Sequence, residues 1–180
     1  LKNEADAVFG SRMMARGAAL KGGMPFYKYV GNRILTISQN LLLKTKFSEF
    51  HSGYRLYSVE ALKQIPFDLN VNDFHFDTEI IIQLVFAEKL IRELPIPTYY
   101  GDEICHVNGL KYAFQVINTS FRASIQKYNL LYDRKFDCAP KGKLYKPKFD
   151  YISPHSLALR NVSNKSFVLD IGCADGYVAA

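Results

Sequence analysis

Hydrophobic positions in the first part of the chain predict a strand followed by a helix. Residues 7–9 form a short apolar run that leads into Gly-Ser-Arg at 10–12, which is typical of a buried strand with a polar loop at its carboxyl end. After a glycine-rich stretch, apolar side chains recur at the spacing of one helix face. These are Tyr27, Val30, Ile34, Ile37 and Leu41. Lys28, Arg33 and Lys44 fall elsewhere on this helix, which is therefore basic and amphipathic.

Three further elements follow. Residues 50–57 alternate as in a strand or an extended loop, and residues 59–65 have a short helical pattern that Pro66 ends. Residues 80–87 are apolar nearly all round, which predicts a helix that begins near Asp77 and packs inside the domain. The sequence thus places much of the hydrophobic core on this helix.

A strand and a long helix complete the first predicted domain. Residues 90–100 have a strand pattern, in which Pro95 and Pro97 each remove a hydrogen-bond donor and favour an edge or a bulge. After a polar loop, apolar side chains recur on one face of a long helix. They are Leu110, Phe114, Ile117, Phe121, Ile125 and Tyr128.

A change of composition marks the end of this domain. After Tyr132 the chain becomes rich in Lys, Pro, Asp and Gly, which is typical of a linker between domains. Residues 167–171 then form an apolar strand pattern that runs into a glycine turn. We therefore expect an α/β fold with a first domain over residues 1–132, a linker over 133–166 and the start of a second domain over 167–180.

Composition narrows the class of protein. Of the 180 residues, 48% are apolar, which suits one sizeable globular core, and no apolar run approaches the roughly 20 residues of a membrane span. The three cysteines lack metal-type spacing, which argues against a disulfide scaffold and a zinc site and favours a reducing, cytoplasmic setting. The net charge of +6 comes without an aromatic-rich basic motif, so we expect anionic or phosphate-bearing partners and no nucleic acid.

Four short motifs in order carry the functional information. They are Gly-Ser-Arg at 10–12, His-Ser-Gly-Tyr-Arg at 51–55, Phe-Asp-Thr-Glu at 76–79 and Glu-Leu-Pro-Ile-Pro at 93–97. Their order and approximate spacing resemble family 2 glycosyltransferases, most closely the branch of dolichyl- and polyprenyl-phosphate sugar synthases. The resemblance covers about residues 5–102 and extends more weakly to the end of the long helix.

The resemblance implies the C-terminal half of a Rossmann-like GT-A glycosyltransferase domain that uses a nucleotide-sugar donor. In that family a divalent metal ion, Mg²⁺ or Mn²⁺, is held by an upstream Asp-x-Asp motif, and this chain has no such motif in that place. The first residues also lack an initiating Met and a signal-peptide pattern. We therefore expect that the N-terminal half is missing, that the fragment alone is inactive, and that it lacks the metal ligands of that motif.

The resemblance assigns the donor diphosphate to Arg12 and Arg55. A forked guanidinium at this place would neutralise charge on the departing nucleotide. Ser52 and Gly53 belong to the same predicted site, because the glycine allows the backbone to approach a phosphate closely. A surface arginine on a loop is the alternative interpretation of Arg12.

Asp77 and Glu79 match acidic residues that inverting transferases place at the acceptor side. An inverting transfer needs a base that takes the proton of an acceptor hydroxyl. The same two residues are also typical of a helix N-terminus, where an acid in the first turn is favourable. A lipid-phosphate acceptor is already anionic and needs no base, so the catalytic role and the capping role both stay open.

The basic amphipathic helix resembles the family's helix that lies at the membrane surface and contacts a lipid-phosphate acceptor. Arg33 and Thr36 are the matching acceptor-binding residues. A helix whose apolar stripe faces the core, with solvated lysines, explains the same pattern. The first alternative predicts peripheral contact with the inner face of the membrane.

The loop after the last strand departs from the lipid-phosphate branch. Asp102, Glu103 and His106 stand where that branch has a basic, glycine-rich ending. A sugar hydroxyl on a glycan is therefore the alternative acceptor. In that case His106 would be a lid residue or a distal metal ligand.

Residues 168–176 resemble the first motif of methyltransferases that use S-adenosylmethionine. Asp170, Gly172 and Gly176 would bind this cofactor, because a glycine turn after the first strand lets the methionine portion approach the backbone. Ala174 replaces the middle glycine of the usual pattern. A generic strand followed by a glycine turn is the alternative.

The sequence therefore predicts a bifunctional enzyme in which a glycosyltransferase precedes a methyltransferase. A non-catalytic scaffold attached to a methyltransferase is the main alternative. In a third interpretation the whole chain is a methyltransferase with an N-terminal extension, but the four ordered motifs then have no explanation.

Overall fold

The computed structural model describes residues 5–101, 108–128, 130–138, 152, 154–163 and 167. The chain divides into two units, Leu1–Pro140 and Lys141–Ala180. The first unit contains the sheet and the hydrophobic core. The described part of the second unit contains the helix α6 (Pro154–Asn161).

A three-stranded mixed sheet lies at the centre of the first unit. Its strands are β1 (Ala7–Ser11), β2 (Arg55–Tyr57) and β3 (Ile91–Pro95), in the order β2-β1-β3. β1 runs antiparallel to β2, where Phe9 lies opposite Arg55, and parallel to β3, where Ser11 lies opposite Pro95. The carboxyl ends of β1 and β3 therefore meet at one edge of the sheet. The predicted α/β class is confirmed.

Helices connect and cover these strands. α1 (Ala18–Lys21) and α2 (Phe26–Leu43) follow β1, whereas α3 (Val59–Leu62), the 3-10 helix η1 (Phe67–Leu69) and α4 (Phe76–Phe86) lie between β2 and β3. α5 (Gly109–Gln126) and the 3-10 helix η2 (Arg134–Phe136) follow β3. Ser58 caps α3 and Asn108 caps α5, each through a side-chain oxygen that accepts a backbone N–H of the first turn. The helices predicted from periodic patterns are confirmed.

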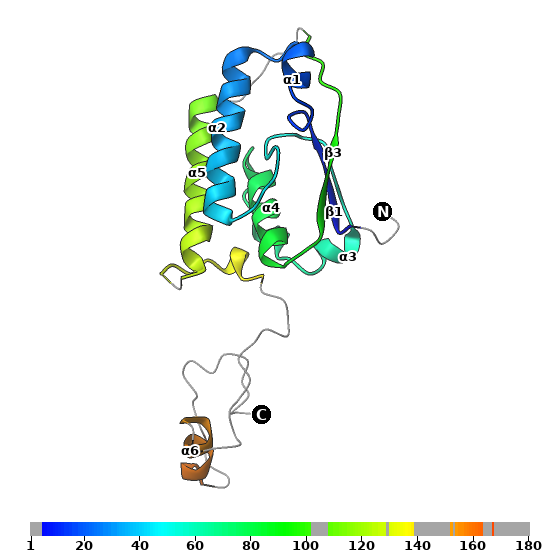
Figure 1. Ribbon diagram of the computed structural model, residues 1–180. Helices are drawn as coiled ribbons and strands as arrows, with labels where there is room; N and C mark the ends of the chain where they lie inside the picture. The colour runs from blue at the N-terminus through cyan, green and yellow to red at the C-terminus, as the bar shows by residue number, and fades with distance from the viewer. Residues whose placement is uncertain are drawn as a thin grey trace. The chain divides into compact units, whose positions relative to one another are not determined.

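The hydrophobic core is built around α4. Ile81, Ile82 and Leu84 are at most 1% exposed, as the nearly all-apolar pattern of this helix predicts, and they share one cluster with Phe9 and Phe50. Burying a side chain of this size stabilises the fold by about 1.5–3 kcal/mol. Figure 1 shows α4 between the strands and the long helices α2 and α5. This core fixes the strand ends that carry the predicted motifs.

The packing of the first unit continues past the predicted end of the first domain at residue 132. Phe136 of η2 is 3% exposed and belongs to the same core cluster as α4, together with Cys138. Burial raises the pKa of the Cys138 thiol to about 12, so this cysteine is an unreactive core residue at neutral pH.

α2 buries polar side chains and exposes apolar ones. Its buried residues are Asn32, Thr36, Gln39 and Leu43. The predicted apolar stripe faces solvent instead, with Tyr27 72%, Ile34 59% and Leu41 75% exposed. Within this chain the stripe therefore does not face the hydrophobic core.

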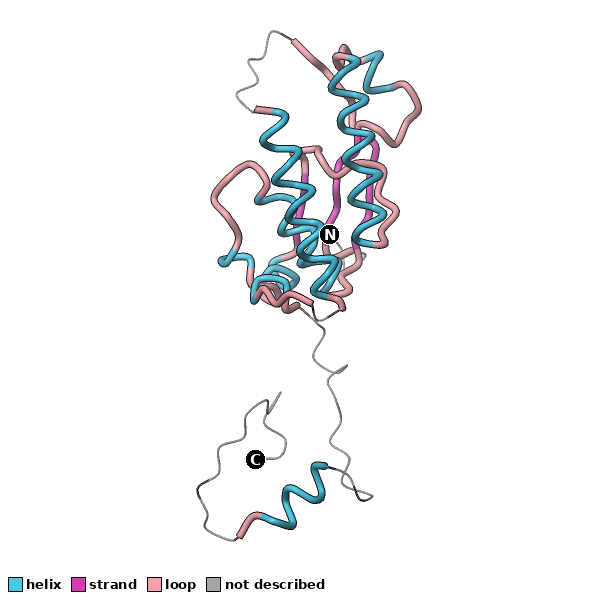
Figure 2. Tube along the Cα trace, turned by 90° about the vertical axis from the view of Figure 1, so that its left-hand side faces the viewer, coloured by secondary structure: helices cyan, strands magenta, loops and turns pink. Residues whose placement is uncertain are grey.

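α5 has the same inverted arrangement. Leu110, Phe114 and Phe121 of its predicted apolar face are 86%, 73% and 52% exposed. Figures 1 and 2 show α2 and α5 side by side over one face of the sheet, and Gln39 Nε2 donates to Ser120 Oγ between them at 3.4 Å. The two helices therefore meet through polar and small side chains and leave apolar ones outside. None of the helices in the described residues has the length and apolar character of a membrane span.

Candidate functional site

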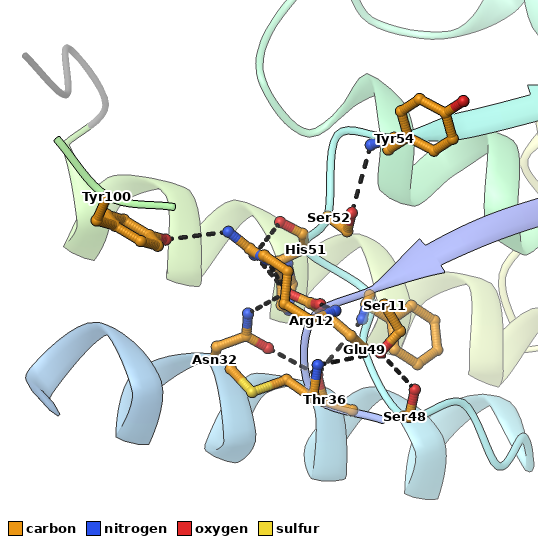
Figure 3. Close-up of polar contacts among 12 residues, drawn as sticks. Ser11, Arg12, Asn32, Thr36, Ser48, Glu49, His51, Ser52, Tyr54 and Tyr100 are labelled. Carbon is orange, nitrogen blue, oxygen red and sulfur yellow. Dashed lines mark hydrogen bonds and ion pairs between the residues drawn. The ribbon is translucent and has the colours of Figure 1, made fainter. Parts of the chain in front are cut away.

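Arg12 leaves the carboxyl end of β1 and meets the carboxylate of Glu49. The backbone N–H of Arg12 donates to Glu49 Oε2 at 2.6 Å, and Nε donates to Oε1 at 2.9 Å. Nη2 also donates to Oε1 and completes a forked ion pair. Figure 3 shows these contacts between the end of β1 and the segment that leads to the His-Ser-Gly-Tyr-Arg motif. The ion pair thus joins the Gly-Ser-Arg motif to the segment just before the His-Ser-Gly-Tyr-Arg motif.

The Glu49 side chain is completely buried, so its charge needs compensation from neighbouring groups. Asn32 on α2 donates from Nδ2 to Glu49 Oε1 at 2.7 Å. Thr36, one turn later, donates to Asn32 Oδ1 at 3.2 Å and accepts the N–H of Phe50 at 3.4 Å. The buried polar face of α2 therefore fixes the Glu49 carboxylate, which in turn fixes Arg12.

The other donors of Arg12 reach two further segments. Nη1 donates to the hydroxyl of Tyr100 at 3.0 Å, and Nη2 donates to the carbonyl of His51 at 3.0 Å. Although burial lowers the pKa of Arg12, Glu49 and Tyr100 together outweigh this effect and the net pKa is raised. Arg12 is therefore permanently charged, and most of its donors already have hydrogen-bond partners. Its side chain is 20% exposed.

A second carboxylate fixes the segment that carries Glu49. Glu93, on β3, accepts the backbone N–H of Ser48 at 2.9 Å and the Ser48 hydroxyl at 2.7 Å. The Ser48 hydroxyl in turn lies 2.7 Å from that of Ser11. This network ties the ends of β1 and β3 to one loop, so the Gly-Ser-Arg and Glu-Leu-Pro motifs meet around Ser48.

Arg55 forms a separate ion pair with Asp77. Its Nη1 lies 3.1 Å from Asp77 Oδ1, and the Arg55 side chain is 5% exposed, compared with 43% for Asp77. Nη2 of Arg55 donates to the carbonyl of Phe50, and the guanidinium carbon lies 5.5 Å from the ring centroid of Phe9. Asp77 therefore stays open to solvent beside a buried cation.

His51 is held between the two arginines and α5. Its Nδ1 lies 2.9 Å from the hydroxyl of Tyr112, and Nε2 is buried with no hydrogen-bond partner among the described residues. Burial, and then the positive charges of Arg55 and Arg12, lower the pKa of His51 to about 3. The imidazole is therefore neutral at physiological pH and is a poor general base.

A cleft of about 860 Å³ opens beside these groups, between the first half of α2 and the start of α5. Arg12 and Lys28 are the cations that line it. The Lys28 ammonium lies 5.4 Å from the centroid of the Tyr100 ring, which is within cation–π range. The apolar lining includes Ile34, Leu35, Phe74 and Leu110. The cleft is therefore amphiphilic.

The structure brings only some of the predicted site residues together. Arg12 lines the cleft, whereas Arg55 lies next to it with Asp77. The Ser52 hydroxyl is buried and accepts the N–H of Tyr54 at 3.3 Å, and space around Gly53 is open. These diphosphate assignments stay predictions.

Asp77 and Glu79 point to different partners. Glu79 is 1% exposed, accepts the N–H of Val71 at 2.8 Å and pairs with Lys135 Nζ at 2.6 Å. Glu79 thus anchors the loop before α4 and the turn at η2, while Asp77 faces solvent. Of the two predicted catalytic acids, Asp77 alone is accessible to an acceptor.

The predicted acceptor residues of α2 also separate. Arg33 is exposed, and Thr36 is 2% exposed and occupied by Asn32 and Phe50. His106, Asp170, Gly172 and Gly176 lie outside the described residues. The lid, the distal metal ligand and the S-adenosylmethionine site therefore remain predictions.

Several residues of the site have no counterpart in the motif analysis. They are Lys28, Asn32, Glu49, Tyr100 and Tyr112. The spacing of Asn32, Thr36 and Gln39 was a usable signal, because three polar side chains recur there at helical intervals opposite the apolar stripe. No group of three or more His, Cys, Asp or Glu side chains in the described part of the chain is placed to hold a metal ion.

Comparison with known proteins finds two relatives. The chain is 34% identical over 101 residues to the low-salt glycan biosynthesis hexosyltransferase Agl6 of Haloferax volcanii, a match that covers 56% of this chain and 23% of that protein. It is 32% identical over 117 residues to the uncharacterised protein MJ1222 of Methanocaldococcus jannaschii, covering 62% of this chain and 47% of the relative. The chain thus matches less than half the length of each relative.

No family model matches the chain, and no solved structure matches it. The similarity to a named hexosyltransferase of glycan biosynthesis, over more than half of this chain, agrees with the glycosyltransferase resemblance of the four motifs. The chain is accordingly related in sequence to a sugar-transferring enzyme.

Proposed function

We propose that this chain forms part of a glycosyltransferase that moves a sugar, with inversion, from a nucleoside-diphosphate sugar to a lipid-phosphate acceptor. The ordered motifs and the similarity to a hexosyltransferase support the reaction class. The choice of a lipid-phosphate acceptor is based on the amphiphilic cleft. Arg12 and Lys28 suit a phosphate, and the apolar lining beside them suits a hydrocarbon chain.

The outer faces of α2 and α5 support a lipid-bound acceptor. Neither helix contains an acidic residue, while Lys28, Arg33, Lys111 and Arg122 are basic. Exposed apolar side chains lie on both helices, and Leu41 and Phe114 are among the most exposed. Apolar and basic side chains together favour the surface of an anionic bilayer. In this proposal the two helices rest on the membrane and the cleft opens towards it.

The two ion pairs have distinct roles in the proposal. Arg12, fixed by Glu49, faces the phosphate of the acceptor or the donor at the cleft. Arg55 balances Asp77, which is the accessible acid if the acceptor is a glycan hydroxyl; a lipid phosphate attacks without a base. The described residues offer no ligand cluster for Mg²⁺ or Mn²⁺, so no step is assigned to a metal held by this chain.

The test measures release of nucleoside diphosphate from a panel of nucleotide-sugars by the full-length protein, with a polyprenyl phosphate or an oligosaccharide as acceptor. Arg12→Lys and Arg55→Lys keep the charge but lose the forked donor geometry, so we expect transfer to fall about a hundredfold in each. Arg134→Lys, at an exposed position on η2 that does not line the cleft, makes the same exchange and is the control.

The two acceptors in this experiment distinguish a lipid-phosphate substrate from a glycan substrate. Transfer that depends on the polyprenyl phosphate supports the proposal, and transfer that depends on the oligosaccharide replaces it with the glycan alternative. Absence of turnover with every donor and acceptor contradicts the glycosyltransferase proposal and favours a scaffold.

A further inference from the structure

The sequence contains one Asn-Gly pair, Asn108-Gly109, and the structure places it at the start of α5. Asn108 is the N-cap of this helix, and Gly109 is its first residue. Both residues are exposed, and both line the cleft. An asparagine amide and the peptide bond that follows it are therefore open to water within the candidate site.

The glycine leaves the backbone nitrogen after Asn108 unshielded. Asparagine is one of the chemically labile residues of proteins, and glycine has no side chain that would hinder approach to its own nitrogen. A Cβ built at Gly109 would have no heavy atom of another described segment within 4 Å. The Gly109 nitrogen can therefore approach the side-chain carbonyl carbon of Asn108, with which it would close a five-membered ring.

Few contacts hold Asn108 away from this geometry. Its Oδ1 accepts the N–H of Lys111 at 3.1 Å, and its ψ is 104°. Ring closure needs this hydrogen bond to open and ψ to change. The first turn of α5 resists such opening weakly, because Leu110 is 86% exposed and Gly109 has a low helix propensity. A helix end with so little burial opens locally, without unfolding of the core.

We propose that Asn108 is a site of spontaneous deamidation, through a cyclic imide formed with the backbone nitrogen of Gly109. The nitrogen attacks the side-chain carbonyl carbon, and its proton leaves with the amide group as ammonia. Water then adds to either carbonyl of the imide and yields aspartate or isoaspartate. The net reaction consumes one water and releases one ammonia, so it needs no other reactant. It does not depend on the proposed sugar transfer.

Both products change the charge of the cleft. Aspartate caps a helix as well as asparagine does, and a negative charge is favourable at a helix N-terminus. Isoaspartate adds one carbon atom to the main chain, which displaces its carboxylate from the N–H of Lys111. Either product adds a negative charge to a cleft that Arg12 and Lys28 line. The positive charge of the cleft therefore falls as the protein ages.

The experiment incubates the full chain at mildly alkaline pH and follows each asparagine by peptide mapping, which separates amide, aspartate and isoaspartate. Asn161 is the internal control, because it is also exposed but precedes Val162, whose β-branched side chain shields the attacking nitrogen. We expect Asn108 to deamidate at least about tenfold faster than Asn161. Conversion of Asn108 no faster than that of Asn161 would overturn the proposal.

Gly109→Ala tests the role of the glycine. Alanine fits at this position, since its Cβ meets open space and φ of Gly109 is not positive, and it favours the closed first turn of α5. We expect deamidation of Asn108 to slow about tenfold in this variant, with no change at Asn161. An unchanged rate at Asn108 would exclude the cyclic imide and contradict the proposal. Neither measurement uses a sugar donor, so the result is independent of the transfer assay.

Discussion

Glu49 is the residue on which the geometry of the site depends most. Its carboxylate accepts from the backbone and the guanidinium of Arg12 and from Asn32, and it is closed off from water. A charge in such a place is tolerated only while its partners remain. The position of Arg12 at the cleft therefore depends on a buried carboxylate.

We expect Glu49→Gln to destabilise the first unit by about 3 kcal/mol, because it leaves the partly buried Arg12 without a counter-charge. Urea unfolding followed by circular dichroism measures the loss. Glu60→Gln is the control, since Glu60 pairs with Lys63 at the surface with 78% of its side chain exposed and should change stability by less than about 0.5 kcal/mol. Equal losses in both variants would contradict a special role for Glu49.

His51 makes stability depend on pH in the acid range. Its folded pKa of about 3 lies below the ordinary value of 6.5, so the unfolded chain binds the proton more readily. The contribution of the neutral imidazole is therefore present above about pH 6.5 and is lost as the pH falls towards 3. Between pH 7 and 5 this loss amounts to about 2 kcal/mol.

The pH prediction is tested by urea unfolding of the wild type and of His51→Asn at pH 7 and pH 5. Asparagine does not titrate, so the wild type should lose about 2 kcal/mol more than the variant over this interval. Arg55 and Arg12 are the charged groups that act on His51. The same pH dependence in both proteins would show that His51 is not the group responsible.

At the scale of elements, α2 and α5 are inverted amphipathic helices. Their buried faces carry the site, through Asn32 and Thr36 on α2 and Tyr112 on α5. Their exposed faces carry large apolar side chains. The helical periodicity of apolar residues predicted both helices but not which face of each is buried. A face of polar side chains can also be buried when these side chains have hydrogen-bond partners.

The exposed faces lead to a prediction about membranes. Leu41→Glu on α2 and Phe114→Glu on α5 should each weaken binding to vesicles of phosphatidylglycerol and phosphatidylcholine about tenfold. Each variant replaces an exposed apolar side chain, which would enter the bilayer, by a charge that the anionic lipid repels. Co-sedimentation measures the bound fraction. Val59→Glu on α3, at a site 64% exposed, makes the same kind of change away from both helices and should leave binding unchanged. Loss of binding only in the control would contradict the proposed surface.

At the scale of the whole molecule, much of the fold was predictable and less of the site was. The apolar run at β1 and the all-apolar pattern of α4 each belong to one short stretch, so local sequence identifies them. Arg12 was found by its motif. Glu49 and Tyr100 were missed, because their roles come from contacts across 37 and 88 positions of sequence, which no local pattern contains.

The parallel pairing of β1 with β3 joins residue 11 to residue 95 and has a consequence for synthesis. On the ribosome, β1 emerges long before its parallel partner, and at 5–20 residues per second the delay is on the order of ten seconds. During this time one apolar strand has its backbone groups unpaired on that side, as in an edge that recruits other chains. We therefore expect the nascent chain to be most prone to aggregation in this interval, which ends when β3 leaves the exit tunnel.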